Sequence, residues 1–161
     1  MNAEILKSCE ELVALLKQKE LKIATAESCT GGMLSTYITA VAGASKVFEL
    51  GVTSYSNQIK NTILKVDDKT LTEHGAVSKQ TALQMAKNVR NIANADIGVS
   101  VTGVAGPDGQ DGYDAGVVFV GISDKNTTHV HKLQIEPLNR NFVRETAVLK
   151  LTKLIIKFIN N

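Results

Sequence analysis

Apolar residues recur every three or four positions in three long segments of the chain, which is the pattern of an amphipathic helix with one buried face. The first segment ends near Lys19, the second follows Ser78, a residue suited to a helix N-cap, and the third follows Pro137 and closes the chain. Their apolar faces carry Ile5, Cys9, Leu12 and Leu16; Ala82, Met85, Ala86, Val89 and Ile92; and Val143, Ala147, Leu151, Leu154 and Phe158.

Five runs rich in apolar and β-branched residues lie between these helices and predict strands. They span residues 21–26, 48–55, 96–103, 117–122 and 128–135, and shorter helical patterns cover 34–43, 57–64 and 67–73. Strands that alternate with helices predict a parallel sheet, and two consecutive strands near the end predict an antiparallel member. We therefore expect an α/β fold in one domain over residues 1–161: a three-layer α/β/α sandwich with a mostly parallel mixed sheet.

The composition and charge of the chain disfavour several classes of function. The apolar content of 43% and charged content of 21% are typical of a soluble globular domain, and no apolar run approaches the length of a membrane span. A net charge of +2 and 4% aromatic residues do not favour nucleic acid as a partner. Two cysteines and an N-terminus without a signal-like pattern predict a cytoplasmic protein without disulfides.

The chemically unusual residues follow predicted strands. In open α/β sheets, ligands bind beyond the carboxyl ends of the strands, so these loops are expected to form one site. The loops are residues 28–32, 55–60 and 102–106.

The first loop, within TAESCTGGML, offers three nucleophilic side chains in succession, Ser28, Cys29 and Thr30, followed by Gly31 and Gly32. The glycines permit close approach of a substrate, and backbone N–H groups at the start of the next helix can bind a phosphate or an oxyanion. The same residues could equally serve only as a helix cap and a relaxed turn.

A nucleophilic serine needs a base, and the histidines are poorly placed to supply it. His74 lies in a turn, and His129 and His131 lie on one face of a late strand without a third metal ligand in the sequence, so we expect no metal site. The segment TSYSNQIK offers Tyr55 and Lys60 instead. A lysine that is desolvated in a crevice can be neutral near physiological pH and can accept a proton from a serine.

Two other readings of these loops are weaker. Cys29 as the nucleophile would usually require a histidine or another positive neighbour, and a small buried side chain is the simpler interpretation. The segment from Thr102 to Gly106, TGVAG, has neither the glycine spacing of a dinucleotide fingerprint nor the Lys-Ser/Thr of a P-loop. Its backbone N–H groups and the Thr102 hydroxyl could still hold a small anionic ligand.

The motifs AESCTGG, SYSNQIK, HGAVS and VTGVAGPDG, in this order and with these separations, resemble the C-terminal domain of the CinA family, in the form of a stand-alone nicotinamide-nucleotide amidase. The resemblance covers nearly the whole chain. It implies a hydrolase that deamidates nicotinamide mononucleotide to nicotinate mononucleotide and ammonia in pyridine nucleotide salvage, and thus in NAD metabolism. It also implies an α/β/α fold, no metal or other cofactor, and a homodimer.

The resemblance also assigns roles to residues. Ser28 matches the family nucleophile, Lys60 its base, and Tyr55 the hydroxyl that supports them. The nucleotide-binding loop matches Thr102, Gly103, Ala105 and Gly106. The family's Gly-Asp-Arg before the last helix is here Leu138, Asn139 and Arg140, followed by Arg144, so Arg140 keeps the charge expected to meet the substrate.

The resulting hypothesis is acyl transfer through a Ser-Lys dyad. Lys60 removes the proton of Ser28, whose oxygen attacks the carboxamide carbon, while backbone N–H groups of Thr30, Gly31 and Gly32 hold the oxyanion. Tyr55 would relay a proton to the leaving ammonia. The alternative is a non-catalytic module for nucleotide sensing or interaction, which would bind phosphate with the same loops.

Overall fold

The computed structural model describes all residues from 1 to 161, and in it five strands form one mixed sheet in the order β2-β1-β3-β4-β5. The strands are β1 (Ile23–Glu27), β2 (Phe48–Thr53), β3 (Ile97–Gly103), β4 (Val117–Ser123) and β5 (Thr128–Gln134). Strands β2, β1 and β3 are mutually parallel, whereas β4 runs antiparallel to both β3 and β5. The predicted mixed sheet with an antiparallel member is confirmed.

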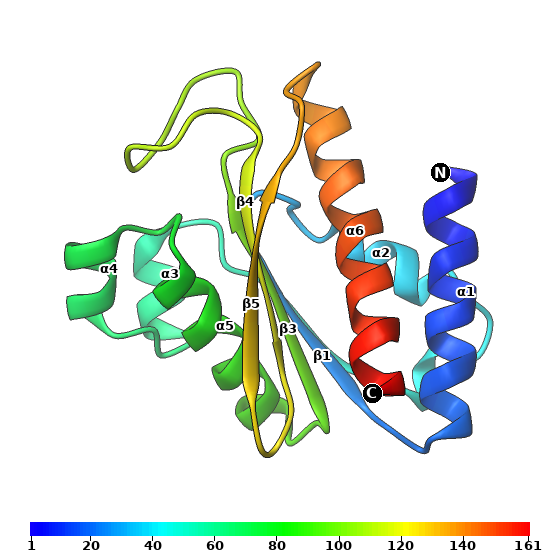
Figure 1. Cartoon of the computed structure of the whole chain (residues 1–161). Helices are drawn as coiled ribbons and strands as arrows, with labels where there is room; N and C mark the ends of the chain where they lie inside the picture. The colour runs from blue at the N-terminus through cyan, green and yellow to red at the C-terminus, as the bar shows by residue number, and fades with distance from the viewer.

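Helices cover both faces of this sheet (Figure 1). One face carries α1 (Ala3–Gln18), α2 (Met33–Thr39) and α6 (Arg140–Asn160), and the other carries α3 (Asn57–Thr62), α4 (Asp68–His74) and α5 (Lys79–Ala93). A short 3-10 turn, η1 (Ala44–Lys46), leads into β2. The predicted α/β/α sandwich is therefore correct. None of the helices combines the length and the apolar character that a membrane span requires.

Side chains at the helix starts explain several of the observed boundaries. The oxygens of Ser56, Ser78 and Asn139 accept hydrogen bonds from backbone N–H groups in the first turns of α3, α5 and α6. Ser78 is thus the N-cap that the sequence predicted. Because Ser56 begins α3, the extended segment predicted for residues 48–55 ends as a strand at Thr53, and Tyr55 belongs to the loop.

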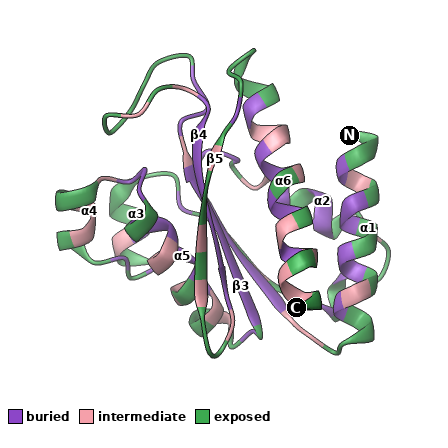
Figure 2. Ribbon diagram, viewed as in Figure 1, coloured by how far each residue is buried: buried purple, intermediate pink, exposed green.

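The core is divided by the sheet, whose central strands are buried on both faces (Figure 2). The larger apolar cluster lies between the sheet and α1, α2 and α6, and two smaller ones lie on the α5 side. Helix α5 approaches the sheet closely at Gly98 and Gly121, where a Cβ atom would collide with backbone of that helix. This close packing holds α5 directly against β3 and β4.

Candidate active site

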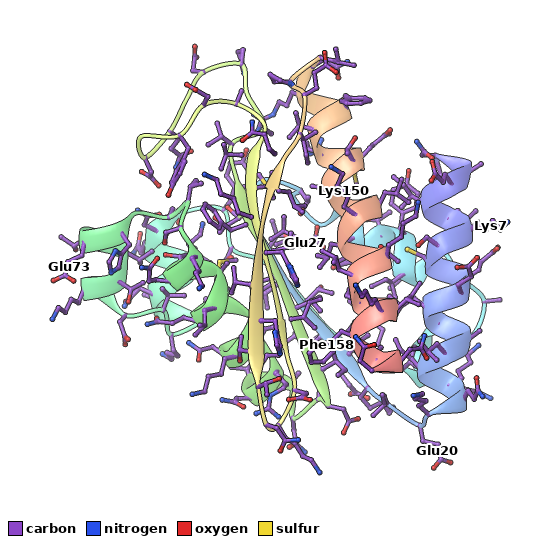
Figure 3. The ribbon with its side chains drawn as sticks, in the orientation of Figure 1. Lys7, Glu20, Glu27, Glu73, Lys150 and Phe158 are labelled. Atoms are coloured by element: carbon purple, nitrogen blue, oxygen red, sulfur yellow. The ribbon has the colours of Figure 1, made fainter.

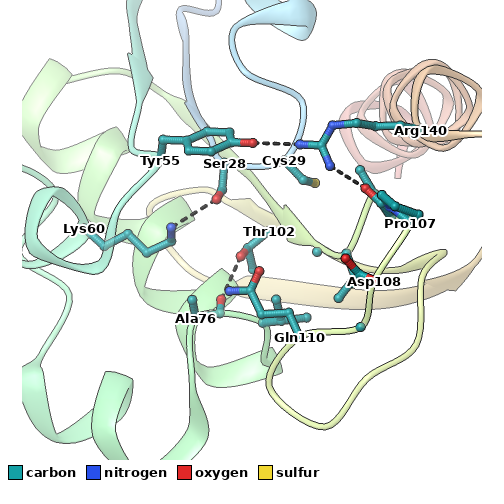
Figure 4. Close-up of a pocket in the computed structure, with 16 residues that line it drawn as sticks. Ser28, Cys29, Tyr55, Lys60, Ala76, Thr102, Pro107, Asp108, Gln110 and Arg140 are labelled. Carbon is teal, nitrogen blue, oxygen red and sulfur yellow. Dashed lines mark hydrogen bonds between the residues drawn. The ribbon is translucent and has the colours of Figure 1, made fainter.

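A cavity of about 360 Å³ lies at the carboxyl ends of β1 and β3. The loops that follow β1, β2 and β3 all contribute to its wall, as the sequence predicted. Eight of the predicted site residues line it: Ser28, Tyr55, Lys60, Thr102, Gly103, Ala105, Gly106 and Arg140. Its wall also includes Cys29, Ala76, Val77 and the loop residues Val104 and Pro107–Gln110, and Figure 4 shows these side chains around one space.

Ser28 and Lys60 meet in the wall of this cavity. The Nζ atom of Lys60 lies 3.0 Å from the Oγ atom of Ser28, although the two residues are 32 positions apart in the chain. Ser28 follows β1 and its N–H donates to the carbonyl of Val101, which extends the pairing with β3 by one residue. Lys60 extends from α3, and its Nζ also donates to the carbonyl of Ser54 at 2.8 Å, so the amine is held in place from two sides.

Burial changes the protonation of Lys60. Its side chain is only 1% exposed, and this desolvation lowers its pKa from an ordinary value of 10.5 to about 8, despite smaller opposing contributions from Cys29 and Asp111. With a pKa near 8, about a tenth of the molecules carry a neutral Lys60 at pH 7. A neutral amine within hydrogen-bond reach of Ser28 has the geometry and the basicity of a general base.

Cys29 is present in the same wall but is chemically quiet. Burial raises the pKa of its thiol to about 12, and the lowering effects of its own backbone and of Lys60 and Arg140 are smaller. The group is therefore a thiol at neutral pH, which supports the interpretation of Cys29 as a small buried side chain.

Glu27, a residue that the sequence reasoning missed, organises the turn that carries Ser28. Its carboxylate is 1% exposed and accepts four hydrogen bonds of 2.7 to 3.0 Å. The donors are the hydroxyl of Thr30, the N–H of Leu34, and both the N–H and the hydroxyl of Ser35. Figure 3 places Glu27 within the body of the domain, whereas Glu20 and Glu73 project from its surface. A glutamate that closes an apolar strand was the signal available in the sequence.

The three residues predicted as oxyanion donors do not line the cavity. Thr30 is fully buried and bonded to Glu27 through its hydroxyl, and the N–H of Gly31 donates to the carbonyl of Ser28 at 3.0 Å. Gly31 and Gly32 adopt positive φ angles of 59° and 91°, so they shape the turn. Of the residues that follow Ser28 directly, Cys29 lines the cavity, and its N–H donates to no oxygen atom of the chain.

Arg140 bridges two walls of the cavity. Its guanidinium donates to the carbonyl of Gly106 at 2.6 Å and to the hydroxyl of Tyr55 at 2.7 Å (Figure 4). The Tyr55 hydroxyl thus contacts Arg140 and makes no hydrogen bond to Ser28 or Lys60, in contrast to its predicted position beside the dyad. Asn139 caps α6 by accepting from the N–H of Phe142, so the amide performs the capping that a carboxylate would.

The hydroxyl of Thr102, another predicted site residue, is already engaged within the chain. The Thr102 hydroxyl donates to the carbonyl of Ala76 at 2.7 Å, so toward a ligand it can act only as an acceptor. His, Cys, Asp and Glu side chains form no group of three or more that could hold a metal ion.

Comparison with known proteins identifies the family. The family model described as the CinA C-terminal domain matches residues 6–159. This chain belongs to the CinA family.

Relatives and solved structures agree with this assignment. A competence-damage inducible protein of Thermoanaerobacter sp. (strain X514) is 46% identical over 151 residues, which cover 93% of this chain and 36% of the relative. A Bacillus subtilis protein described in the same words is 41% identical over 150 residues, with the same two coverages of 93% and 36%. This CinA domain therefore spans about a third of the length of the relatives that it matches.

Two crystal structures match the whole domain. The competence/damage inducible protein CihA from Agrobacterium tumefaciens has a TM-score of 0.95 and 32% identity, with 100% of this chain and 98% of that chain covered. A CinA superfamily protein from Enterobacter cloacae has a TM-score of 0.93 and 31% identity, with 99% and 94% covered. The CinA-domain fold is thus shared along nearly the full chain.

Proposed function

We propose that this CinA domain hydrolyses the carboxamide of nicotinamide mononucleotide to nicotinate mononucleotide and ammonia. The observation that carries the proposal is the 3.0 Å approach of a buried lysine amine to a serine hydroxyl in the wall of a cavity. The family assignment supports an amidase, and the pyridine nucleotide is the substrate that the resemblance of the motifs implies.

The reaction would proceed in two halves. In the first, Lys60 takes the proton of Ser28 as the serine oxygen bonds to the carboxamide carbon, and the tetrahedral intermediate then expels ammonia with the proton returned by Lys60. In the second half, Lys60 removes a proton from a water molecule as the water oxygen attacks the acyl carbon. The Ser28 oxygen then leaves and takes that proton back from Lys60. The products are nicotinate mononucleotide and the free serine.

Two features of the site support the roles of the base and of the oxyanion donor in this scheme. The hydrogen bond from Lys60 to the Ser54 carbonyl holds the amine beside Ser28 throughout both halves. Cys29 lines the cavity next to the nucleophile, and its N–H donates to no oxygen of the chain, whereas the N–H of Gly31 is bonded to the Ser28 carbonyl; the N–H of Cys29 is therefore the better candidate to stabilise the oxyanion.

Release of ammonia from nicotinamide mononucleotide tests the proposal. The wild type should release ammonia, and Ser28→Ala and Lys60→Ala should each reduce kcat by at least a hundredfold while the fold is preserved by circular dichroism. Cys29→Ala is the matched control in the adjacent position and should keep its rate within a few-fold. Full activity in Ser28→Ala would exclude the serine mechanism, and nucleotide binding without turnover by the wild type would favour the sensing module.

A further inference from the structure

The loop between β3 and β4, residues 106–116, is fastened to the start of α5. In Figure 1 this loop leaves the top of the sheet and reaches across toward α4. At its far end, the Asp111 carboxylate accepts a hydrogen bond of 2.9 Å from the N–H of Val77, which directly precedes the N-cap Ser78. A Cβ atom on Gly75 would lie 2.8 Å from the same carboxylate, so Asp111 fits into the space that this glycine leaves.

Other contacts hold the loop at its root, Gly106, and along its return limb, the residues after Gly112 that lead back to β4. Arg140 donates to the Gly106 carbonyl at the root. Across the tip of the loop, Gln110 and Tyr113 exchange two backbone hydrogen bonds of 2.9 Å. On the return limb, the Tyr113 ring packs edge-on against Phe119 with centroids 5.5 Å apart.

Between the Gly106 and Asp111 attachments lies the part of the loop that lines the cavity. Pro107, Asp108, Gly109 and Gln110 all contribute to the wall opposite the dyad, whereas Asp111 itself does not. Their position depends on both ends of this short stretch. Loss of the attachment at Asp111 would leave the cavity wall held by Arg140 at Gly106, and by the pairing of Gln110 with Tyr113, whose ring packs on Phe119.

We propose that Asp111 is a positioning residue that fastens this loop over the cavity and thereby sets the affinity for the nucleotide. The inference rests on the proposed amidase function. Asp111 does not touch the substrate: it acts through Asp108 and Gln110, which line the cavity.

Asp111 also has an electrostatic effect on Lys60, which can be measured separately from its effect on the loop. Its charge raises the pKa of Lys60, against the larger lowering by burial. The titratable and charged groups that share the cavity with Lys60 are Cys29, Tyr55, Asp108 and Arg140. Removal of the Asp111 charge would lower the Lys60 pKa further, so the acid limb of the activity profile would move to lower pH.

The test compares Asp111→Ala and Asp111→Asn with Asp114→Ala, a control in the same loop whose exposed carboxylate makes no hydrogen bond. The loss of one hydrogen bond at this exposed position predicts a roughly five- to tenfold higher KM for nicotinamide mononucleotide in Asp111→Ala, with kcat within about twofold. Asp111→Asn, whose amide oxygen can still accept from Val77, should show a smaller rise. Both Asp111 variants should shift the acid limb of kcat/KM to lower pH, and Asp114→Ala should not.

Equal KM values in Asp111→Ala and Asp114→Ala would overturn the proposal. A hydrogen-exchange measurement on the free protein tests the attachment without any substrate: the Val77 amide should exchange faster in Asp111→Ala than in Asp114→Ala. Equal exchange would overturn the attachment itself. An inactive wild type would instead contradict the amidase proposal, and the exchange result would still decide the role of Asp111.

Discussion

Replacement of Lys60 by methionine should stabilise this protein at neutral pH while it abolishes the proposed activity. Lys60 is the one charged side chain among the largest fully buried residues, and its burial disfavours the protonated form. Methionine has a similar length and no charge, so it removes that cost without opening a large cavity. The expectation is unusual for a core position, where most substitutions destabilise.

The magnitude follows from the pKa of Lys60. A decrease from 10.5 to about 8 corresponds to about 3 kcal/mol of unfavourable free energy when the amine is protonated in both states. Against this gain, the variant leaves the Ser54 carbonyl without the donor that Lys60 provides, a loss of about 1 to 2 kcal/mol. The net prediction is a free energy of unfolding about 1 to 2 kcal/mol larger at pH 7.

The sign reverses at high pH. Below pH 8 both states are protonated and the full cost is present, between pH 8 and 10.5 the unfolded chain binds more protons than the folded one, and above 10.5 the cost is gone. The stability of the wild type should therefore rise from pH 8 to 10.5 relative to that of the variant. At pH 10.5 the variant should be the less stable protein, because only the lost hydrogen bond then distinguishes them.

Urea unfolding at pH 7 and at pH 10.5 measures both differences, with Lys150→Met at an exposed position of α6 as the control for a lysine-to-methionine change. For a chain of this length, the gain at pH 7 should appear as a melting temperature roughly 2 to 8 °C higher. A Lys60→Met protein that is less stable than the wild type by the same amount at both pH values would refute the reasoning. That result would mean that Lys60 is not destabilised by burial.

Two further predictions concern the same site. Since only neutral Lys60 can accept the serine proton, kcat/KM of the wild type should fall about tenfold per pH unit below pH 8 and level off above it, and a flat profile from pH 6 to 9 would contradict a lysine base. Glu27→Gln should lower the free energy of unfolding by about 3 kcal/mol, because the amide nitrogen of glutamine is a donor and would face groups that donate to the carboxylate in the wild type. Ser56→Ala, which removes a helix cap, should lower the free energy of unfolding by only about 1 kcal/mol in the same urea assay.

Much of the fold could be predicted from the sequence because its long helices are strongly amphipathic and its central strands are apolar. The periodic segments that became α1, α5 and α6 are correct to within a few residues. The strand order could not be predicted, because β1 pairs with β3 across two intervening helical connections and the edge strand β2. Such pairings depend on how the crossovers pack, which local patterns do not encode.

The candidate site was also predictable only in part. Ser28 and Lys60 could be brought together from the sequence because each follows a strand of a parallel pair, and the carboxyl ends of such strands share an edge of the sheet. The hydrogen-bond partners of the Tyr55 hydroxyl and of the Glu27 carboxylate could not be predicted, because they depend on the direction of side chains around turns. The free N–H at Cys29 likewise depends on which donors the Gly31 turn uses.

Burial shifts the pKa values of the two candidate reactive groups in opposite directions, because it favours the uncharged form of each. For Cys29 it favours the thiol and raises the pKa, and for Lys60 it favours the amine and lowers the pKa. A thiolate paired with an ammonium ion would require the Coulomb attraction between Cys29 and Lys60 to exceed both desolvation costs, yet desolvation is the largest contribution for each group. The environment therefore disfavours a cysteine nucleophile and increases the fraction of neutral amine beside the Ser28 hydroxyl, which is the combination that a serine with a lysine base requires.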